Sequence, residues 1–334
     1  MTDDGLKADL VLSGGGVKGI GLAGAIVALM DAGYQVPRVS GTSAGSVVGA
    51  ILAAGADQLT PADVKNLAMT LPYRKFLDPG PIEKIPVLGP AWGLLSEEGV
   101  YKGDFAHDWI RGQLKDLGVN TFGDLALDDD TLPPERRYRL VVTVADVTTG
   151  QLVRLPWDYR RLYGLDPDEQ SVADAVRASM SIPFFFHTVK LTSAEGLTST
   201  LVDGGVLSNF PIDSFDRPDG KPPRWPTFGI TLLPNLPQDN AKVIPALAPL
   251  HWLGGGPTLL ESLITTMIVG RDQAYLNQPW VSARAIRVDS TDVGFLDFDI
   301  SDPQKEELYQ RGYDAAAAFL STWSWAEYRK RFRR

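Results

Sequence analysis

The first 56 residues contain the same unit twice: a short apolar strand, a glycine-rich turn and an apolar helix. Residues 9–12 (DLVL) lead into Ser13-Gly14-Gly15-Gly16, and an apolar pattern with helical spacing follows. Residues 36–40 lead in the same way into Gly41-Thr42-Ser43-Ala44-Gly45 and a second helical pattern. Strands that alternate with helices run parallel, because each helix carries the chain back to the start of the next strand. The pattern therefore predicts a parallel α/β sheet with both glycine turns at one crevice.

Further strands and one long helix are predicted beyond this region. Residues 139–145 (RLVVTVA) form a continuous apolar run, which is typical of a strand buried on both faces. Shorter strands are expected at 201–202, 227–233 and 283–288. Residues 306–320 have the spacing of a C-terminal helix. Its candidate buried positions are Leu308, Ala315, Phe319 and Leu320.

The chain has no cysteine and only three histidines, which are His107, His187 and His251. Without cysteine it has no disulfide, thiolate metal site or cysteine nucleophile. Three scattered histidines are too few for a histidine-rich metal site, so neither a metal nor another cofactor is expected. The 41 acidic residues outnumber the 32 basic ones and give a net charge of −9. This balance argues against a nucleic-acid partner.

No segment has the length of a membrane span. The longest apolar stretch, residues 19–30, is short of the ~20 residues that cross a bilayer. The N-terminus carries Asp3 and Asp4 instead of the basic start of a signal peptide. We therefore expect a cytoplasmic protein. Residues 328–334 are basic and aromatic; a solvated, frayed tail is the expectation, and peripheral contact with anionic lipid heads is the alternative.

Residues 41–45 fit the pattern G-x-S-x-G, with Gly41 and Gly45 on either side of Ser43. A strand before this pattern and a helix after it are the context of a nucleophilic serine. Small residues let the chain turn sharply, and the helix that follows points its N-terminus at the hydroxyl, where negative charge would develop. The alternative is a serine that only caps the helix. The motif by itself leaves both interpretations open.

Residues 14–19 fit G-x-G-x-x-G at Gly14, Gly16 and Gly19. One interpretation is a dinucleotide-binding turn, which needs an acidic residue near the end of the second strand. That strand runs into Ser40 and Gly41 without an acid. The other interpretation is an oxyanion hole, in which glycine-rich backbone presents N–H groups to an anion and a lysine adds positive charge. Two glycine turns at adjacent strand ends favour the oxyanion hole.

A nucleophilic serine needs a base, and histidine is the usual one. His251 is the only histidine that follows both Ser43 and Asp203, so a Ser–Asp–His order is open. However, His251 lies in an apolar loop, His187 follows three phenylalanines, and His107 lies in a helical pattern. A structural role is the better interpretation of each histidine.

Asp203 is the better candidate for the base. It follows a predicted strand and precedes Gly204 and Gly205. A carboxylate at a strand end can take the serine proton directly if burial raises its pKa above the ordinary value near 3.9. The alternative is an aspartate that caps its own turn.

Together these motifs resemble those of the patatin-like phospholipases. The resemblance rests on the glycine turn at 14–19, the G-x-S-x-G motif and the turn that begins at Asp203. Three further segments match the family's pattern, and they are RASMSIP at 177–183, VDGGVLSNFP at 202–211 and the strand and turn at 142–150. The match covers about residues 8–213. Residues 184–187 (FFFH) depart from it, because they are bulkier and more aromatic than the family's pattern.

The resemblance implies a three-layer α/β/α fold with a mixed, mainly parallel central sheet. It implies a catalytic dyad in which Ser43 is the nucleophile and Asp203 the general base, without a metal. The oxyanion hole would consist of backbone N–H groups around Gly14, Gly15 and Gly16. The expected substrate and partner is a phospholipid, lysophospholipid or other acyl lipid. The supporting motif residues are Lys18, Gly19, Gly41, Gly45, Gly204 and Gly205.

Residues 8–213 are expected to form the catalytic core, and residues 214–334 an extension that completes the same single domain. Two other functions stay open: a Ser–Asp–His esterase that uses His251, and a non-enzymatic module that binds lipid or protein. The Pro- and Gly-rich segments 76–99 and 245–260 either pack as irregular core or form a lid or an acyl-binding wall.

Overall fold

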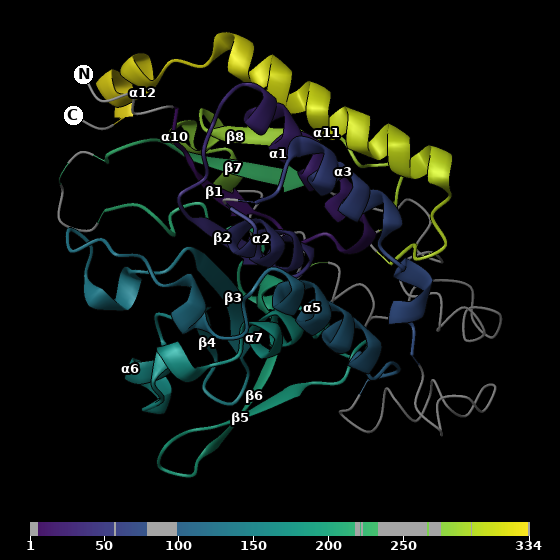
Figure 1. The fold of residues 1–334 in the computed structure, drawn as a ribbon, viewed down its shortest axis with the longest axis vertical. Helices are drawn as coiled ribbons and strands as arrows, with labels where there is room; N and C mark the ends of the chain where they lie inside the picture. The colour runs from purple at the N-terminus through teal and green to yellow at the C-terminus, as the bar shows by residue number, and fades with distance from the viewer. Residues whose placement is uncertain are drawn as a thin grey trace.

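The computed structural model describes residues 6–56, 58–78, 99–217, 221, 223–232, 266, 275–294 and 296–332. These residues form one eight-stranded sheet in the order β5-β6-β3-β2-β1-β7-β8, and β4 also pairs with β3 (Figure 1). β8, β7, β1, β2 and β3 are parallel neighbours, whereas β4 and β6 run antiparallel to β3, and β5 runs antiparallel to β6. The prediction of a mixed, mainly parallel sheet is confirmed.

The strands are short, as the sequence predicts. Their bounds are β1 (Asp9–Leu12), β2 (Val39–Thr42), β3 (Leu140–Asp146), β4 (Gln151–Leu155), β5 (Val189–Thr192), β6 (Thr198–Asp203), β7 (Thr227–Leu232) and β8 (Ala285–Val288). The α-helices are α1 (Gly19–Asp31), α2 (Ala44–Ala54), α3 (Pro61–Thr70), α5 (Asp104–Asp116), α6 (Tyr159–Tyr163), α7 (Val172–Ser179), α10 (Pro279–Ser282), α11 (Asp302–Thr322) and α12 (Trp325–Phe332). The 3-10 turns are Gly16–Lys18, Tyr73–Phe76, Phe122–Leu125, Pro134–Arg136, Pro167–Glu169 and Gly204–Val206.

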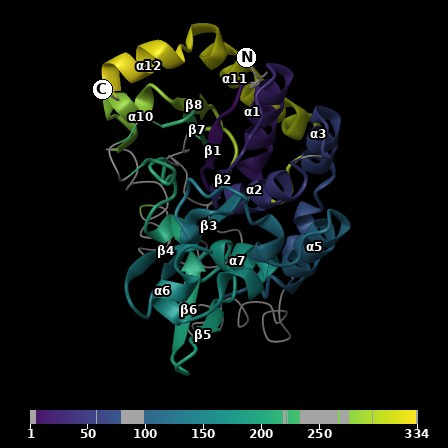
Figure 2. The same cartoon turned by 60° about the vertical axis from the view of Figure 1, so that its left-hand side comes forward.

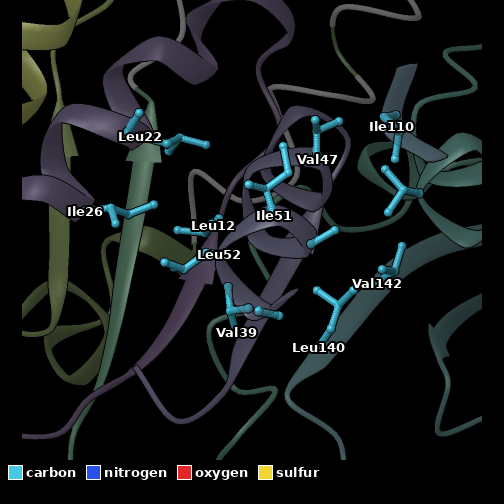
Figure 3. Close-up of a cluster of buried hydrophobic side chains, with 14 of the residues drawn as sticks. Leu12, Leu22, Ile26, Val39, Val47, Ile51, Leu52, Ile110, Leu140 and Val142 are labelled. Atoms are coloured by element: carbon cyan, nitrogen blue, oxygen red, sulfur yellow. The ribbon is translucent and has the colours of Figure 1, made fainter. Parts of the chain in front are cut away.

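Both faces of the parallel strands are buried, and alternate residues serve opposite faces. Leu10 and Leu12 of β1 belong to the larger core, which α1 and α2 cover (Figures 2 and 3). Val11 belongs to a second core cluster, together with Phe210 and Val281. The apolar strand runs in the sequence follow from this burial on two sides.

Several predicted boundaries were wrong by a few residues, for local reasons. The second strand begins at Val39 instead of residue 36, because Pro37 lacks the N–H that a ladder needs and Arg38 turns its side chain to Asp9. The last strand begins at Ala285 because Ala283 still caps α10. The long C-terminal helix begins earlier than residue 306, after the capping box that Ser301 forms with Gln304. Of its four candidate core residues, Leu308 is buried, while Ala315, Phe319 and Leu320 are half-buried.

The expectation of a frayed C-terminal tail was wrong for the part that the structure describes. Residues Trp325–Phe332 form α12, and the buried Tyr328 donates a hydrogen bond from its hydroxyl to the carbonyl of Trp280. Aromatic contacts join Tyr328 to its neighbours Trp323 and Phe332. These contacts give the helix an apolar anchor, while its basic side chains are exposed.

No helix in the described residues is long and apolar enough to cross a membrane.

The helices α1 and α11 pack against each other with their backbones in close contact (Figure 1). A Cβ atom on Gly312 would lie 2.0 Å from the carbonyl oxygen of Gly21. A Cβ atom on Gly24 would lie 2.0 Å from the carbonyl oxygen of Tyr309. Both contacts are with backbone, which has no flexible end that could move aside. This crossing therefore requires glycine at both positions.

At this crossing, a Gly→Ala substitution is expected to destabilise the protein, whereas in an exposed helix it is stabilising. Gly→Ala in an exposed helix stabilises by about 1 kcal/mol, and this is expected for Gly112→Ala in α5, where a Cβ has nothing within 4 Å. Gly312→Ala should instead lower the free energy of unfolding by about 1–3 kcal/mol, because the new methyl group overpacks the crossing. Urea denaturation of the two variants measures both effects. A Gly312→Ala protein as stable as Gly112→Ala would contradict the proposed close contact.

Candidate active site

Ser43 lies in the sharp turn between β2 and α2. Its backbone has φ 52° and ψ −124°, a conformation that a residue with a side chain rarely adopts. Two glycines make the turn possible, since a Cβ on Gly41 would lie 2.2 Å from the carbonyl oxygen of Gly45, and one on Gly45 2.5 Å from that of Leu12. Such a strained residue costs about 1–3 kcal/mol and persists only where its surroundings hold it in place.

Ser179, at the end of α7, holds the strained turn from a distant part of the chain. Its Oγ accepts a hydrogen bond from the backbone N–H of Ser43 at 2.9 Å. The same hydroxyl donates to the carbonyl of Thr143 in β3 at 2.7 Å. Ser179 is fully buried. The hydroxyl therefore connects the Ser43 turn to the central strand in a place where water does not compete.

Ser43 and Asp203 meet because two strands end head-on along one edge of β3. β2 runs parallel to β3 and ends with Thr42 opposite Thr143. β6 runs antiparallel to β3 and ends with Asp203 opposite Val144. β4 occupies the other edge of β3 at these residues. The ends of β2 and β6 thus face consecutive residues of β3, which brings the serine after Thr42 to the aspartate.

The carboxyl group of Asp203 is buried, and this changes its acidity. Burial is the main cause that raises the pKa of Asp203 to about 7, while the Ser43 hydroxyl and the Gly205 N–H act in the opposite direction. Oδ1 accepts the N–H of Gly205 at 2.7 Å. Oδ2 has no hydrogen bond of good geometry from the described residues. The Ser43 hydroxyl is therefore close to the carboxyl without a fully formed hydrogen bond.

The glycine turn after β1 is tied to the loop that follows Asp203. The N–H of Gly14 donates to the carbonyl of Asn209 at 3.2 Å, and Nδ2 of Asn209 donates to the carbonyl of Gly14 at 3.3 Å. A Cβ on Gly14 would lie 2.3 Å from Oδ1 of Asn209 and 2.9 Å from Cβ of Ser43. In the described residues, no acceptor is found for the N–H groups of Gly15 and Gly16. These two are the available donors of the turn.

Lys18 lies at the start of α1 and is buried. Burial lowers the pKa of Lys18 to about 8, while the carboxylates of Asp292 and Asp289 act in the opposite direction. The lysine side chain is therefore part of an ionic cluster between α1 and the loop before α11. It is available as a positive charge in the same segment as the glycine turn.

An apolar pocket of about 60 Å³ opens beside Ser43. Its walls are mainly apolar side chains from α1, α2, α3 and the loops around Met180 and Phe298, and Gly16 and Ser43 also line it. A second apolar cavity of about 40 Å³ between α1, α2 and α3 shares Val47, Val48 and Leu71 with the first. The aromatic segment that departs from the family's pattern contributes Phe186 to the pocket wall.

The two described histidines lie away from this arrangement. Nε2 of His107 in α5 lies 2.6 Å from Oδ1 of Asp174, and the N–H of His187 donates to the carbonyl of Tyr101. Among the residues that the structure describes, no histidine nitrogen is hydrogen-bonded to Ser43 or Asp203, and no cluster of metal-ligating side chains is found. His251 and most of the segments 76–99 and 245–260 lie outside the described residues.

Sequence reasoning missed Ser179 and Asn209 as parts of the site. Both lie in segments on which the family resemblance was based, so the segments were found without their roles. Ser179 and Ser43 are separated by 136 residues, and no local pattern indicates that they are bonded. Only the three-dimensional pairing of β2, β3 and α7 shows it.

Comparisons with known proteins give the following likenesses. A family model described as "Patatin-like phospholipase" matches residues 10–216, more than half of the chain. The uncharacterized protein YqhO of Bacillus subtilis is 35% identical over 321 residues, which are 95% of this chain and 99% of that protein. The lysophospholipase nte1 of Aspergillus niger is 47% identical over 53 residues, only 16% of this chain and 4% of its own length. VipD from Legionella pneumophila has a similar fold, with a TM-score of 0.51 at 21% identity over 94% of this chain and 67% of VipD.

The buried carboxyl group predicts a pH-dependent stability. The pKa of Asp203 is near 3.8 in the unfolded chain and is raised to about 7 in the fold. The folded protein therefore binds this proton more tightly than the unfolded chain, and its free energy of unfolding falls as pH rises from about 4 to 7. The loss amounts to at most about 4 kcal/mol. Asparagine does not ionise, so Asp203→Asn removes this loss. The variant should have a higher free energy of unfolding than the wild type at pH 8 and nearly the same one at pH 4. Denaturation midpoints at both pH values measure it, with the exposed Asp128→Asn as control; an equal gain at both values would reject the raised pKa.

Proposed function

The chain belongs to the patatin-like phospholipase family, a family of lipid hydrolases, and we propose that it cleaves lipid acyl esters with a dyad of Ser43 and Asp203. The observation that carries this proposal is the head-on meeting of β2 and β6, which puts a strained serine against a buried carboxyl group. Burial raises the pKa of Asp203 to about 7, and a general base works best when its pKa lies near the working pH. The dyad needs no histidine.

In the first step, Asp203 takes the proton of the Ser43 hydroxyl while Oγ attacks the ester carbonyl carbon. The tetrahedral intermediate collapses, the C–O bond to the alcohol breaks, and Asp203 returns the proton to the leaving oxygen. In the second step, Asp203 takes a proton from water, which attacks the acyl-serine. The fatty acid leaves, and the proton returns to Oγ of Ser43. Both steps use the same base in the same place.

The negative charge of each intermediate requires donors that are already in position. The N–H groups of Gly15 and Gly16 fit this role, because they have no acceptor among the described residues and Gly16 borders the pocket beside Ser43. Gly14 supports the turn in a different way, since its N–H is engaged by the carbonyl of Asn209. The buried Lys18 adds positive charge at the start of the same helix.

The apolar pocket beside Ser43 suits the acyl chain of the substrate. Its lining offers hydrocarbon and aromatic surface to a fatty acyl group and almost no polar groups except at the Ser43 end. The cavity that shares Val47 and Val48 with it continues the apolar surface between α2 and α3. We infer a phospholipid or lysophospholipid substrate, and the short match to a lysophospholipase supports this class.

We also propose that residues 214–334 complete one domain with the catalytic core at 8–213. β7 pairs with β1 and β8 pairs with β7, so strands from the extension continue the sheet. α11 packs on α1, the helix that follows the glycine turn.

The dyad is tested with Ser43→Ala and Asp203→Asn against short-chain esters and lysophospholipid. Both variants should fold and lose at least about 10³-fold in kcat, because each removes a group that acts in the transition state. A fluorophosphonate probe should label Ser43 in the wild type and nothing in Ser43→Ala.

His251→Ala separates the dyad from a Ser–Asp–His triad. Full turnover without either dyad side chain, or loss of turnover in a folded His251→Ala protein, would refute the dyad.

The Ser179 hydroxyl should matter for turnover more than for substrate binding. Ser179→Ala leaves the N–H of Ser43 and the carbonyl of Thr143 without their partner, and a lost buried hydrogen bond costs about 1–3 kcal/mol. We expect kcat to fall about 10–100-fold with little change in KM, and the fluorophosphonate to label Ser43 more slowly.

Ser181→Ala is the matched control for this variant, because the Ser181 hydroxyl is equally buried but bonds to Arg177 instead of the Ser43 turn. It should lose stability and retain most of kcat. Equal losses of kcat in the two variants would contradict the role assigned to Ser179.

A further inference from the structure

A cavity that borders the start of β1 lies at the edge of the sheet opposite the Ser43 turn. It has a volume of about 430 Å³. Asp9 and Thr227, the first residues of β1 and β7, border it, whereas Ser43 follows the end of β2. None of the residues that line the catalytic pocket lines this cavity. The two sites therefore do not share walls, and the function proposed for Ser43 does not explain this cavity.

Basic side chains outnumber acidic ones in the lining of this cavity by six to three, although the protein as a whole has a net charge of −9. Its three carboxylates are Asp9, Asp130 and Asp216, and two of them are already paired. Asp9 is held by Arg38 in a buried ion pair, and Asp216 by the buried Arg284 outside the lining. The six basic lining residues are Arg38, Arg136, Arg137, Arg217, Lys221 and Arg224. Arg224 is also paired, with Asp129 outside the lining. The lining nevertheless keeps an excess of positive charge, which rests on Arg136 and Arg137.

Two of the arginines are fixed by the aromatic walls. The guanidinium of Arg136 lies 5.0 Å from the ring centre of Trp157, and that of Arg224 lies 4.4 Å from the ring centre of Trp225. Stacking engages the flat face of a guanidinium and leaves the N–H groups on its edge available to an acceptor. In Arg224, Nη2 already donates to Oδ2 of Asp129 at 2.7 Å. Arg136 forms no ion pair with any residue that the structure describes. Its charge is therefore positioned at little further cost in side-chain entropy.

Arg137 is held in a way that also preserves its charge. Its Nε donates to the carbonyl of Leu132 at 2.8 Å, and Nη2 donates to the carbonyl of Asp130 at 3.4 Å. Both acceptors are neutral backbone groups, so they orient the guanidinium without neutralising it. Arg136 and Arg137 therefore line the cavity from one short segment. Neither forms an ion pair with a carboxylate among the described residues.

The chemistry of these groups specifies the ligand class. Guanidinium groups bind phosphate and carboxylate oxygens, and their planar fork favours an anion with several acceptor oxygens. A cavity of this volume is far larger than a bare oxyanion and lies in the range of small-molecule sites. Trp157, Trp225 and Phe215 provide flat apolar surface for an organic part. The Arg38 guanidinium, which is paired with Asp9, lies 4.6 Å from the ring centre of Phe215.

We propose that this cavity is a second ligand site, which binds a phosphate monoester with a small organic group through Arg136 and Arg137. The ligand is either a free metabolite or the phosphate headgroup of a lipid, since the two present the same chemistry. Because the site lies at the opposite edge of the sheet, its occupation does not require a functional Ser43.

Calorimetric titration tests the site, with glycerol 3-phosphate as the probe and glycerol as the neutral control. The wild type should bind glycerol 3-phosphate and not glycerol. Arg136→Gln should weaken binding at least about tenfold, because one charge-assisted contact is lost. Arg137→Gln should also weaken binding at least about tenfold. If Arg137 is needed for the folding of its loop, Arg136→Gln alone still tests the proposal. Arg160→Gln, which removes an exposed arginine outside the lining, should bind as the wild type does.

Flotation with phosphatidylcholine vesicles, with and without phosphatidic acid, distinguishes a lipid headgroup from a free ester. Recruitment that depends on phosphatidic acid and on Arg136 supports the lipid source, and glycerol 3-phosphate binding without recruitment supports the free metabolite. The proposal fails if neither probe binds the folded wild type, or if both bind Arg136→Gln and Arg137→Gln as tightly as the wild type. The catalytically inactive Ser43→Ala protein should give the same binding, so failure of the proposed dyad leaves this result unaffected.

Discussion

The head-on meeting of β2 and β6 along one edge of β3 is the constraint on which the candidate active site depends. A parallel and an antiparallel strand share that edge, and they can do so only if one ends where the other ends. Thr143 and Val144 are consecutive, so the residues after the two strands have no room to separate. The proximity of Ser43 and Asp203 is thus a property of strand pairing, and it is fixed by many backbone hydrogen bonds instead of by the two side chains themselves.

The fold stabilises a site that is locally unfavourable. Ser43 has a positive φ, and Asp203 is a carboxyl group removed from water. Neither is self-supporting: the Ser43 turn is held by the Ser179 hydroxyl, and the Asp203 backbone N–H donates to the carbonyl of Ser181 at 2.9 Å. Residues at the end of α7 and just after it therefore hold both Ser43 and Asp203 in place. A helix, a central strand and the glycine turns together hold this carboxyl group at a pKa of about 7.

Local patterns were enough to predict the two strand–turn–helix units, because each strand, glycine turn and helix is encoded by neighbouring residues. They also placed Asp203 at a strand end, and the family resemblance gave it a role. What local patterns do not contain is pairing across long distances. The Ser179–Ser43 hydrogen bond, the anchoring of Tyr328 on Trp280 and the direction of β6 all depend on residues far apart in the chain. The start of β2 was misplaced for a different reason. The prediction gave more weight to the apolar pattern at 36–40 than to Pro37, which has no N–H for a strand pairing.

The two edges of the sheet show how one scaffold supports unlike chemistry. At the carboxyl edge, burial raises the pKa of a carboxyl group, and the described lining of the neighbouring pocket is mainly apolar. At the amino edge, Arg136 is stacked on an indole ring and keeps its charge while its position is fixed. A mobile basic surface would be screened by salt and would select no particular anion. A fixed one can select by shape, which is why the orientation of Arg136 and Arg137, more than their number, determines whether this edge acts as a site.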